Sequence, residues 1–306
     1  MPPMLSATPE GGHGLAGVTP RLCLQCNGPI DPDAPPAQKY CQGSCRSKAY
    51  RRRSKQSAPP IIHPDLHETP PPWPHHEVPI AVVAHPKRSE QAEALSEKIH
   101  AEAVIMDHPR YPDGHFVNHL RAWSWLSGGN CPWSVVLEDD AVPLSRPPGT
   151  QSFRWQLHAA LKAARSPVVS LYLGTSHPSL WQSCIALAVG QTHQRDACFF
   201  TSPYLLHGVG YAVRTELIPD LLKSITPLQH TLPIDAAVSL WCRARSHTVS
   251  YTWPSLVDHA DGPSLIPDRD RSLPRRAWCV DSRASWEPTA LPLPLPEPLR
   301  EMGVTA

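Results

Sequence analysis

The chain has 306 residues, a formal net charge of +1 and 41% hydrophobic residues. This balance excludes a polyelectrolyte, and no apolar run approaches the roughly 20 residues that a membrane-spanning helix needs. The N-terminus lacks a basic start followed by an apolar core, so we expect no signal peptide, no membrane partner and a cytoplasmic protein.

Four of the nine cysteines form two closely spaced pairs, Cys23 with Cys26 and Cys41 with Cys45. Paired thiolates at such spacings can close a tetrahedral Zn²⁺ site, and a small turn-rich segment without a core needs a cross-link of this kind to fold. We therefore predict a structural zinc finger over residues 21–56, after a disordered tail over residues 1–20. Two disulfides or four unrelated thiols are the alternative.

A basic segment follows the last of these cysteines, with six cations and no acid in residues 46–55. It resembles the end of small four-cysteine fingers that read Tyr-Cys-x-x-x-Cys-Arg-x-x-Ala-Tyr-Arg-Arg-Arg. We predict a helix whose basic face contacts the phosphate backbone of DNA, although a solvated helix end has the same pattern. The cations assigned to this contact are Arg46, Lys48, Arg51, Arg52 and Arg53.

A proline-rich linker over residues 57–78 leads to the main domain, residues 79–285, and a proline-rich tail follows over residues 286–306. Within the main domain, apolar runs and helical periodicity alternate. The predicted strands are 80–84, 103–106, 134–138 and 168–173, and the predicted helices are 89–100, 117–126, 152–164, 215–224 and 235–244. This alternation predicts an α/β fold with a parallel-dominated sheet and right-handed crossovers.

An acidic triplet, Glu138-Asp139-Asp140, stands where the predicted strand 134–138 ends. Ligands of open α/β sheets bind outside the carboxyl ends of strands, and crowded carboxylates repel each other unless a cation neutralises them. Mg²⁺ and Mn²⁺ prefer such oxygen ligands and often share them with substrate phosphates. The triplet therefore predicts a metal site that holds a diphosphate, with an ordinary acidic loop as the alternative.

The region 78–267 resembles glycosyltransferase family 25, the lipopolysaccharide and collagen galactosyltransferase group. The similar segments, in family order, are 78–88, 118–123, 135–142, 171–174, 207–217, 232–235 and 254–266. His85 departs from the Asn-Leu that usually follows the first strand. The resemblance implies a Rossmann-like fold of the GT-A type, a UDP-sugar donor and inversion at the sugar.

The resemblance also implies site residues. Asp140 and His259 would ligate the catalytic Mn²⁺ or Mg²⁺, although a structural histidine at a strand end is the alternative for His259. Asp235 would act as general base on the acceptor hydroxyl, or serve only as an N-cap. The donor-binding residues would be Lys87, Arg88, Glu138 and Asp139, with the two basic residues neutralising the diphosphate.

Fusion to a basic finger favours a nucleic-acid acceptor. We expect transfer of a hexose to a hydroxymethylated pyrimidine in DNA, a modification that a bacteriophage would use in the host cytoplasm. A saccharide or protein acceptor, with a finger that binds a partner protein, is the first alternative. A non-catalytic DNA-binding protein with a degenerate transferase fold is the second.

Overall fold

The computed structural model describes residue 30 and residues 78–107, 114–145, 152–262, 265, 274–297 and 299. The chain divides into two units, Met1–Ala58 and Pro59–Ala306, and nearly all described residues belong to the second. The four cysteines of the predicted finger, its basic segment, the N-terminal tail and the linker up to residue 77 lie outside the described residues. In the described part of the chain, no helix has the length and apolar character needed to cross a membrane.

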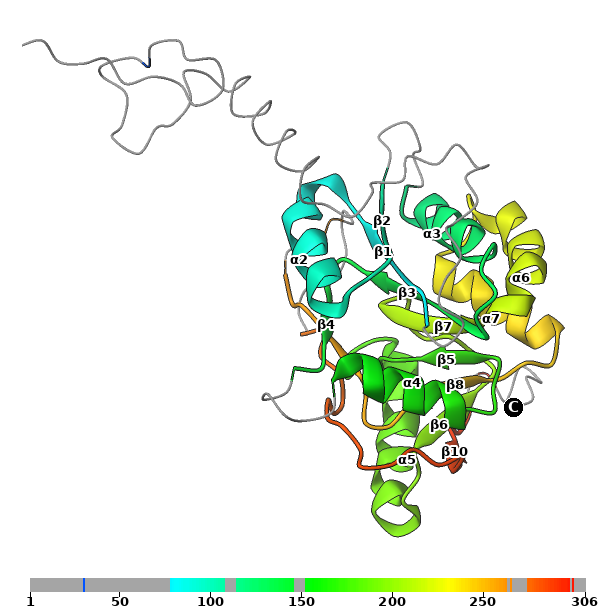
Figure 1. Ribbon diagram of the computed structural model, residues 1–306. Coiled ribbons are helices and arrows are strands. Elements are labelled where there is room, and N and C mark those ends of the chain that lie inside the picture. Colours follow the sequence, from blue (N-terminus) through cyan, green and yellow to red (C-terminus); the bar gives the residue numbers. More distant parts are fainter. Residues whose placement is uncertain are drawn as a thin grey trace, which may run out of the picture. The chain divides into compact units, whose positions relative to one another are not determined.

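The second unit contains an eight-stranded mixed sheet in the order β10-β6-β8-β5-β7-β3-β1-β2 (Figure 1). Its strands are β1 Ile80–Ala84, β2 Ala103–Met106, β3 Trp133–Glu138, β5 Val168–Ser170, β6 Phe199–Ser202, β7 Gly210–Arg214, β8 Val249–Thr252 and β10 Ala290–Pro292. A separate antiparallel pair joins β4 Ala141–Pro143 to β9 Val257–His259.

Helices cover both faces of the sheet. They are α2 Ser89–Ile99, α3 Gly114–Leu126, α4 Phe153–Ala163, α5 Gln182–Arg195, α6 Ile218–Ile225 and α7 Ile234–Ala244. Four short 3₁₀ helices accompany them: η1 Pro86–Arg88, η2 Ser179–Trp181, η3 Thr215–Leu217 and η4 Thr226–Leu228.

The α/β class is confirmed, and the strands and helices predicted between residues 80 and 244 occur close to their predicted positions. The eight-stranded sheet is mixed, with four parallel and three antiparallel pairs, so parallel pairing predominates only narrowly. The antiparallel pairs are β7 with β3, β7 with β5 and β6 with β8. One expectation needs correction. The strand predicted over 168–173 ends at Ser170. The proline-rich tail also contributes β10, which pairs with β6 at an edge of the sheet where Pro292 is tolerated.

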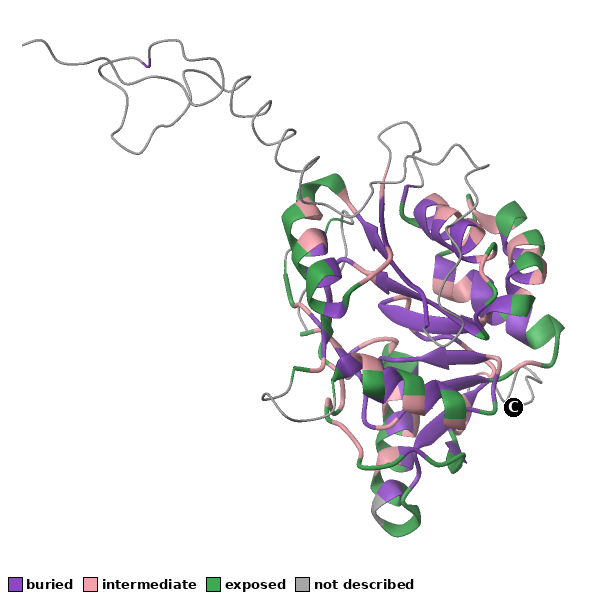
Figure 2. Cartoon of the chain, in the orientation of Figure 1, coloured by how far each residue is buried: buried purple, intermediate pink, exposed green. Residues whose placement is uncertain are grey.

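Alternation along the strands divides the core into two layers. In β1, Ala81 and Val83 pack in a cluster with α3, α5, α6 and α7, whereas Ile80 and Val82 pack in a cluster with α2 and α4. Side chains of a strand alternate between faces, so a strand covered on both sides must be apolar throughout. Figure 2 shows this pattern as buried strands between helices with exposed outer surfaces.

A buried polar contact fixes α3 on the sheet. The indole Nε1 of Trp123 donates to the hydroxyl oxygen of Tyr211 in β7 at 3.0 Å, and both side chains are fully buried. The same hydroxyl lies 3.5 Å from Nδ1 of His119, one turn earlier on α3. Because these groups have no access to water, each depends on the others for its hydrogen bonds.

Tyr211→Phe should lower the free energy of unfolding by about 1–3 kcal/mol, because it leaves the buried indole N–H of Trp123 without its acceptor. Denaturant titration of Tyr211→Phe, Trp123→Phe and the double variant measures the coupling. The double variant should cost clearly less than the sum of the single variants. Additive costs would show that the contact does not stabilise the fold.

Candidate active site

The topology collects polar side chains at one edge of the sheet. Strands β1 and β3 are parallel, so their carboxyl ends lie together, and the antiparallel β7 begins at that same edge beside Glu138. The backbone N–H of Glu138 donates to the carbonyl of Val209 at 2.9 Å, which fixes this approach. The edge is the position predicted for the acidic triplet.

Strand alternation separates the carboxylates. Val136 belongs to the core layer beneath α3, so Glu138, two residues later, faces α3. Leu137 belongs to the layer beneath α2, and Asp139 accordingly meets the turn that leads into α2. The triplet therefore has two sides with different partners.

On the α2 side, Arg88 bridges the two aspartates. Its Nη1 lies 2.9 Å from Oδ1 of Asp139 and 2.5 Å from Oδ2 of Asp140. The backbone N–H of His85 donates to the other oxygen of Asp139 at 2.8 Å. Burial raises the pKa of the Asp139 carboxyl despite these contacts, and the two aspartates raise the pKa of Arg88 against the lowering effect of its own burial.

Arg88, one of the two cations predicted to bind the donor, is thus ion-paired with the two aspartates of the acidic triplet. Lys87 is exposed, and its backbone N–H donates to Nδ1 of His85 at 3.1 Å.

His259 lies beside Asp140, as expected for a shared ligand set. Pairing of β4 with β9 sets Ala141 opposite His259, and the backbone N–H of Ala260 donates to the carbonyl of Asp140 at 2.7 Å. Nε2 of His259 lies 3.4 Å from Oδ2 of Asp140. Oδ1 of Asp140 is buried and has no hydrogen-bond partner among the described residues, so this oxygen is available to a cation.

On the α3 side, Glu138 meets two histidines, His115 and His119. Its Oε1 lies 2.9 Å from Nε2 of His115 and 3.6 Å from Nε2 of His119. Burial alone would raise the pKa of Glu138, but the two histidines hold it well below its usual value. Burial lowers the pKa of the fully buried His119, whereas the contact with Glu138 raises the pKa of the exposed His115.

Asp235 is the second residue of α7, and Pro233 occupies the N-cap position. Asp235 therefore lies in the first turn of the helix and not at the N-cap position itself. Its Oδ1 accepts the backbone N–H of Ala236 at 2.9 Å. Burial raises its pKa, and the charge of Glu138 adds to this effect. A Cβ on Gly208 would meet both Oε1 of Glu138 and the side chain of Ile234, so the start of α7 lies beside the triplet.

Sequence reasoning missed His115, His119 and Gly208 as site residues. The signal for the two histidines was their four-residue spacing, which places both on one helix face. Gly208 precedes β7, and a Cβ on it would lie 2.8 Å from Oε1 of Glu138. Only the sheet pairing reveals that approach.

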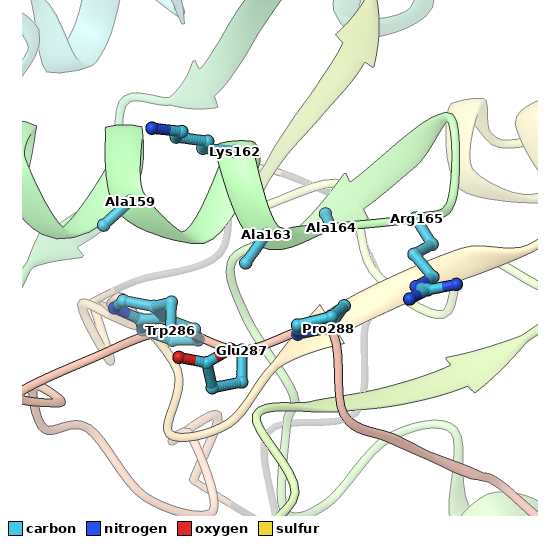
Figure 3. A pocket seen from close by; sticks show the side chains of 8 residues that line it. All are labelled: Ala159, Lys162, Ala163, Ala164, Arg165, Trp286, Glu287 and Pro288. Carbon is cyan, nitrogen blue, oxygen red and sulfur yellow. The ribbon is translucent and has the colours of Figure 1, made fainter.

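A surface hollow lies elsewhere, where the end of α4 meets residues 286–288 (Figure 3). Ala159 and Ala163 face Trp286 across it, while Lys162 points away. Its lining residues are Ala159, Lys162, Ala163, Ala164, Arg165, Trp286, Glu287 and Pro288. None of them belongs to the acidic site, so we assign the chemistry to the carboxylate edge and not to this hollow.

No protein-family model matches the sequence, and a search of curated proteins found no significant match. Function is therefore inferred from the residues and their geometry.

His115→Gln should lower stability most between pH 4.5 and 6.5, the usual pKa values of the two groups. Because folding lowers the pKa of Glu138, this carboxylate stabilises the fold at pH values above its usual pKa, and the stabilisation is lost as the pH falls through its pKa in the folded protein. Because folding raises the pKa of His115, this imidazole stabilises the fold at pH values below its usual pKa, and the stabilisation is lost as the pH rises through its pKa in the folded protein.

Unfolding of chelator-treated wild type, His115→Gln and the exposed control His158→Gln should be followed across this range. The His115 cost should shrink at higher pH, and the control should show no such profile. A pH-independent cost would contradict the ion pair.

Proposed function

We propose that the protein is a glycosyltransferase that uses a nucleotide-sugar donor and a divalent cation. The observation that supports this most directly is the acidic triplet at the carboxyl end of β3, where a buried oxygen of Asp140 next to His259 has no hydrogen-bond partner in the part of the chain that the structure describes. Oxygen and imidazole ligands at a sheet edge suit a hard divalent ion that is shared with a diphosphate. The family 25 resemblance of residues 78–267 supports the same chemistry.

Charge balance on the α2 side favours a cation. One guanidinium, Arg88, faces two carboxylates, Asp139 and Asp140, which leaves one formal negative charge. Mn²⁺ or Mg²⁺ on Asp140 and His259 would reverse that sign and stabilise the charge that develops on the leaving diphosphate. Lys87 would add an exposed cation at the same turn.

Asp235 is the proposed general base. Burial and the charge of Glu138 raise its pKa, which makes its carboxylate a better proton acceptor than an exposed one. In an inverting transfer the base takes the proton of the acceptor hydroxyl, the new bond to the sugar carbon forms, and the donor diphosphate leaves with its electron pair.

Asp140→Asn should abolish hydrolysis of labelled UDP-hexoses and Mn²⁺-dependent binding of UDP. Asp235→Asn should lower turnover by about a hundredfold or more and leave UDP binding nearly intact, because it removes the base and not the cation site. Asp281→Asn, an exposed aspartate, serves as the matched control. Full activity in excess chelator, or of Asp140→Asn, would overturn the cation assignment.

We further propose that the acceptor is a hydroxymethylated pyrimidine in DNA, such as 5-hydroxymethylcytosine or 5-hydroxymethyluracil. The support is the basic segment after Cys45, in which Arg51, Arg52 and Arg53 suit phosphate contact. Through this segment the predicted finger would raise the local concentration of DNA at the catalytic domain. A saccharide or hydroxylated protein is the alternative acceptor.

Replacing Arg51, Arg52 and Arg53 with Gln in the full chain should weaken binding of long hydroxymethylated duplex. The log–log salt slope should fall by about 0.9 for each phosphate that the variant no longer neutralises. Cys41→Ser should act in the same direction and remove about one Zn²⁺ per chain.

Donor hydrolysis should survive both changes, and Lys162→Gln with Arg165→Gln should leave DNA binding unaltered. Transfer to a saccharide or hydroxylysine, without salt-sensitive DNA binding, would decide for the alternative acceptor.

A further inference from the structure

We propose that His115, His119 and Glu138 form a second metal site, for Zn²⁺ or a similar divalent transition-metal ion. The three residues present two imidazole nitrogens and one carboxylate oxygen, all within 4.8 Å of one another. Two imidazoles with one carboxylate is a ligand set that such ions take up, with a fourth position left for a small oxygen ligand. The site is separate from the proposed cation site at Asp140 and His259 and does not depend on the proposed function.

The separations of the ligand atoms fit a tetrahedral ion. Bonds of about 2.0–2.1 Å from a tetrahedral centre place neighbouring ligand atoms about 3.3 Å apart. The Glu138 oxygen lies 2.9 Å from one imidazole nitrogen and 3.6 Å from the other, values on either side of that edge length. The two imidazole nitrogens lie within 4.8 Å of each other, so binding one ion requires the exposed His115 side chain to turn toward His119 and Glu138.

His119 is oriented for ligation. The residue is fully buried, and its Nε2 faces Glu138 with no hydrogen-bond partner among the described residues. On the other side of the ring, Nδ1 lies 3.5 Å from the hydroxyl of Tyr211, which Trp123 also contacts. Metal-binding histidines ordinarily have such a partner on the second nitrogen, because it fixes the ring and the tautomer. A buried imidazole nitrogen without a partner is costly unless something binds it.

The backbone before β7 passes close to the carboxylate ligand. A Cβ on Gly208 would lie 2.8 Å from Oε1 of Glu138, so a side chain there would push the carboxylate away from the two histidines. The His115 side chain is 55% exposed, which gives the ion a route from solvent. His115 and His119 stand one turn apart on α3, with ring centroids 4.9 Å apart, so the helix itself holds the pair together.

The nature of the ligands separates this site from the one proposed for Mn²⁺ or Mg²⁺. Two nitrogens and one oxygen favour a transition-metal ion over Mg²⁺, which prefers oxygen ligands throughout. The site can therefore be measured with Zn²⁺ and Co²⁺ alone, without substrate, and in the presence of excess Mg²⁺.

The experiment measures metal binding by full-length wild type, His115→Ala, Glu138→Gln and Gly208→Ala. His158→Ala, an exposed histidine on α4, is the matched control, and Asp140→Ala tests the other site. Protein stripped with chelator is reloaded with Zn²⁺ in excess Mg²⁺, and bound zinc is counted by mass spectrometry. Affinity is measured by competition with a chromophoric chelator. Circular dichroism verifies that each variant is folded, and His115→Ala, at an exposed position, is the variant least able to disturb the core.

Wild type, His158→Ala and Asp140→Ala should bind one more Zn²⁺ than His115→Ala and Glu138→Gln. Loss of a ligand should weaken this site more than about a hundredfold, and Gly208→Ala should weaken it less, because the carboxylate only shifts. With Co²⁺, His115→Ala should lose the part of the visible d–d absorption that comes from this site and keep the d–d and sulfur-to-cobalt charge-transfer bands of any four-cysteine site.

Equal zinc content in wild type, His115→Ala and Glu138→Gln would overturn the proposal. Loss of the additional zinc in Asp140→Ala, with retention in His115→Ala, would overturn it in favour of the other site.

Discussion

Three consecutive carboxylates at the end of a buried strand are the constraint on which this edge of the protein depends. The side chains of Asp139 and Asp140 are only 7% and 8% exposed, and that of Glu138 is 18% exposed. Like charges this close repel one another strongly where water is scarce, so each carboxylate needs a positive or hydrogen-bonding partner. The protein supplies Arg88 and the His85 backbone to Asp139, Arg88 and His259 to Asp140, and two histidines to Glu138.

The antiparallel strand β7 makes this arrangement possible. In a wholly parallel sheet, the neighbour of β3 would begin at the opposite edge. Because β7 runs the other way, its approach through Gly208 and Val209 lies directly against the end of β3. The small antiparallel pair of β4 with β9 then places His259 beside Asp140. Both connections join segments more than 60 residues apart, and neither leaves a local sequence signal.

The sequence was most informative where burial is continuous. The runs 80–84 and 135–137 are apolar throughout because both faces of their strands are covered, and the strands that contain them were predicted almost to the residue. Strand β8 was missed because it carries buried Ser250 and Thr252 between its apolar residues. Ser250 is tolerated in the core because its hydroxyl bonds to that of Ser166, a partner 84 residues away. Such compensation is tertiary and is invisible to periodicity.

The site shows the same division between local and tertiary information. The acidic triplet and the basic turn at Arg88 could be found from residue type and position after a strand. The pairing of Arg88 with that triplet could not, since it depends on β1 and β3 being neighbours. His115 required two facts together, its helical spacing from His119 and the direction of the Glu138 side chain.

The contacts of Arg88 leave one carboxylate oxygen of Asp140 to another ligand. Asp139 is held from two directions, by the His85 backbone and by the guanidinium, whereas Asp140 shares the guanidinium through one oxygen and keeps the other without a hydrogen-bond partner among the described residues. A divalent ion bound through Oδ1 of Asp140 would therefore leave both contacts of Arg88 in place. Because a guanidinium keeps its charge at any physiological pH, Arg88 would remain beside such an ion as a fixed positive charge. Under the proposed function, that combination would favour an anionic ligand with more than one negative charge, as a nucleoside diphosphate has.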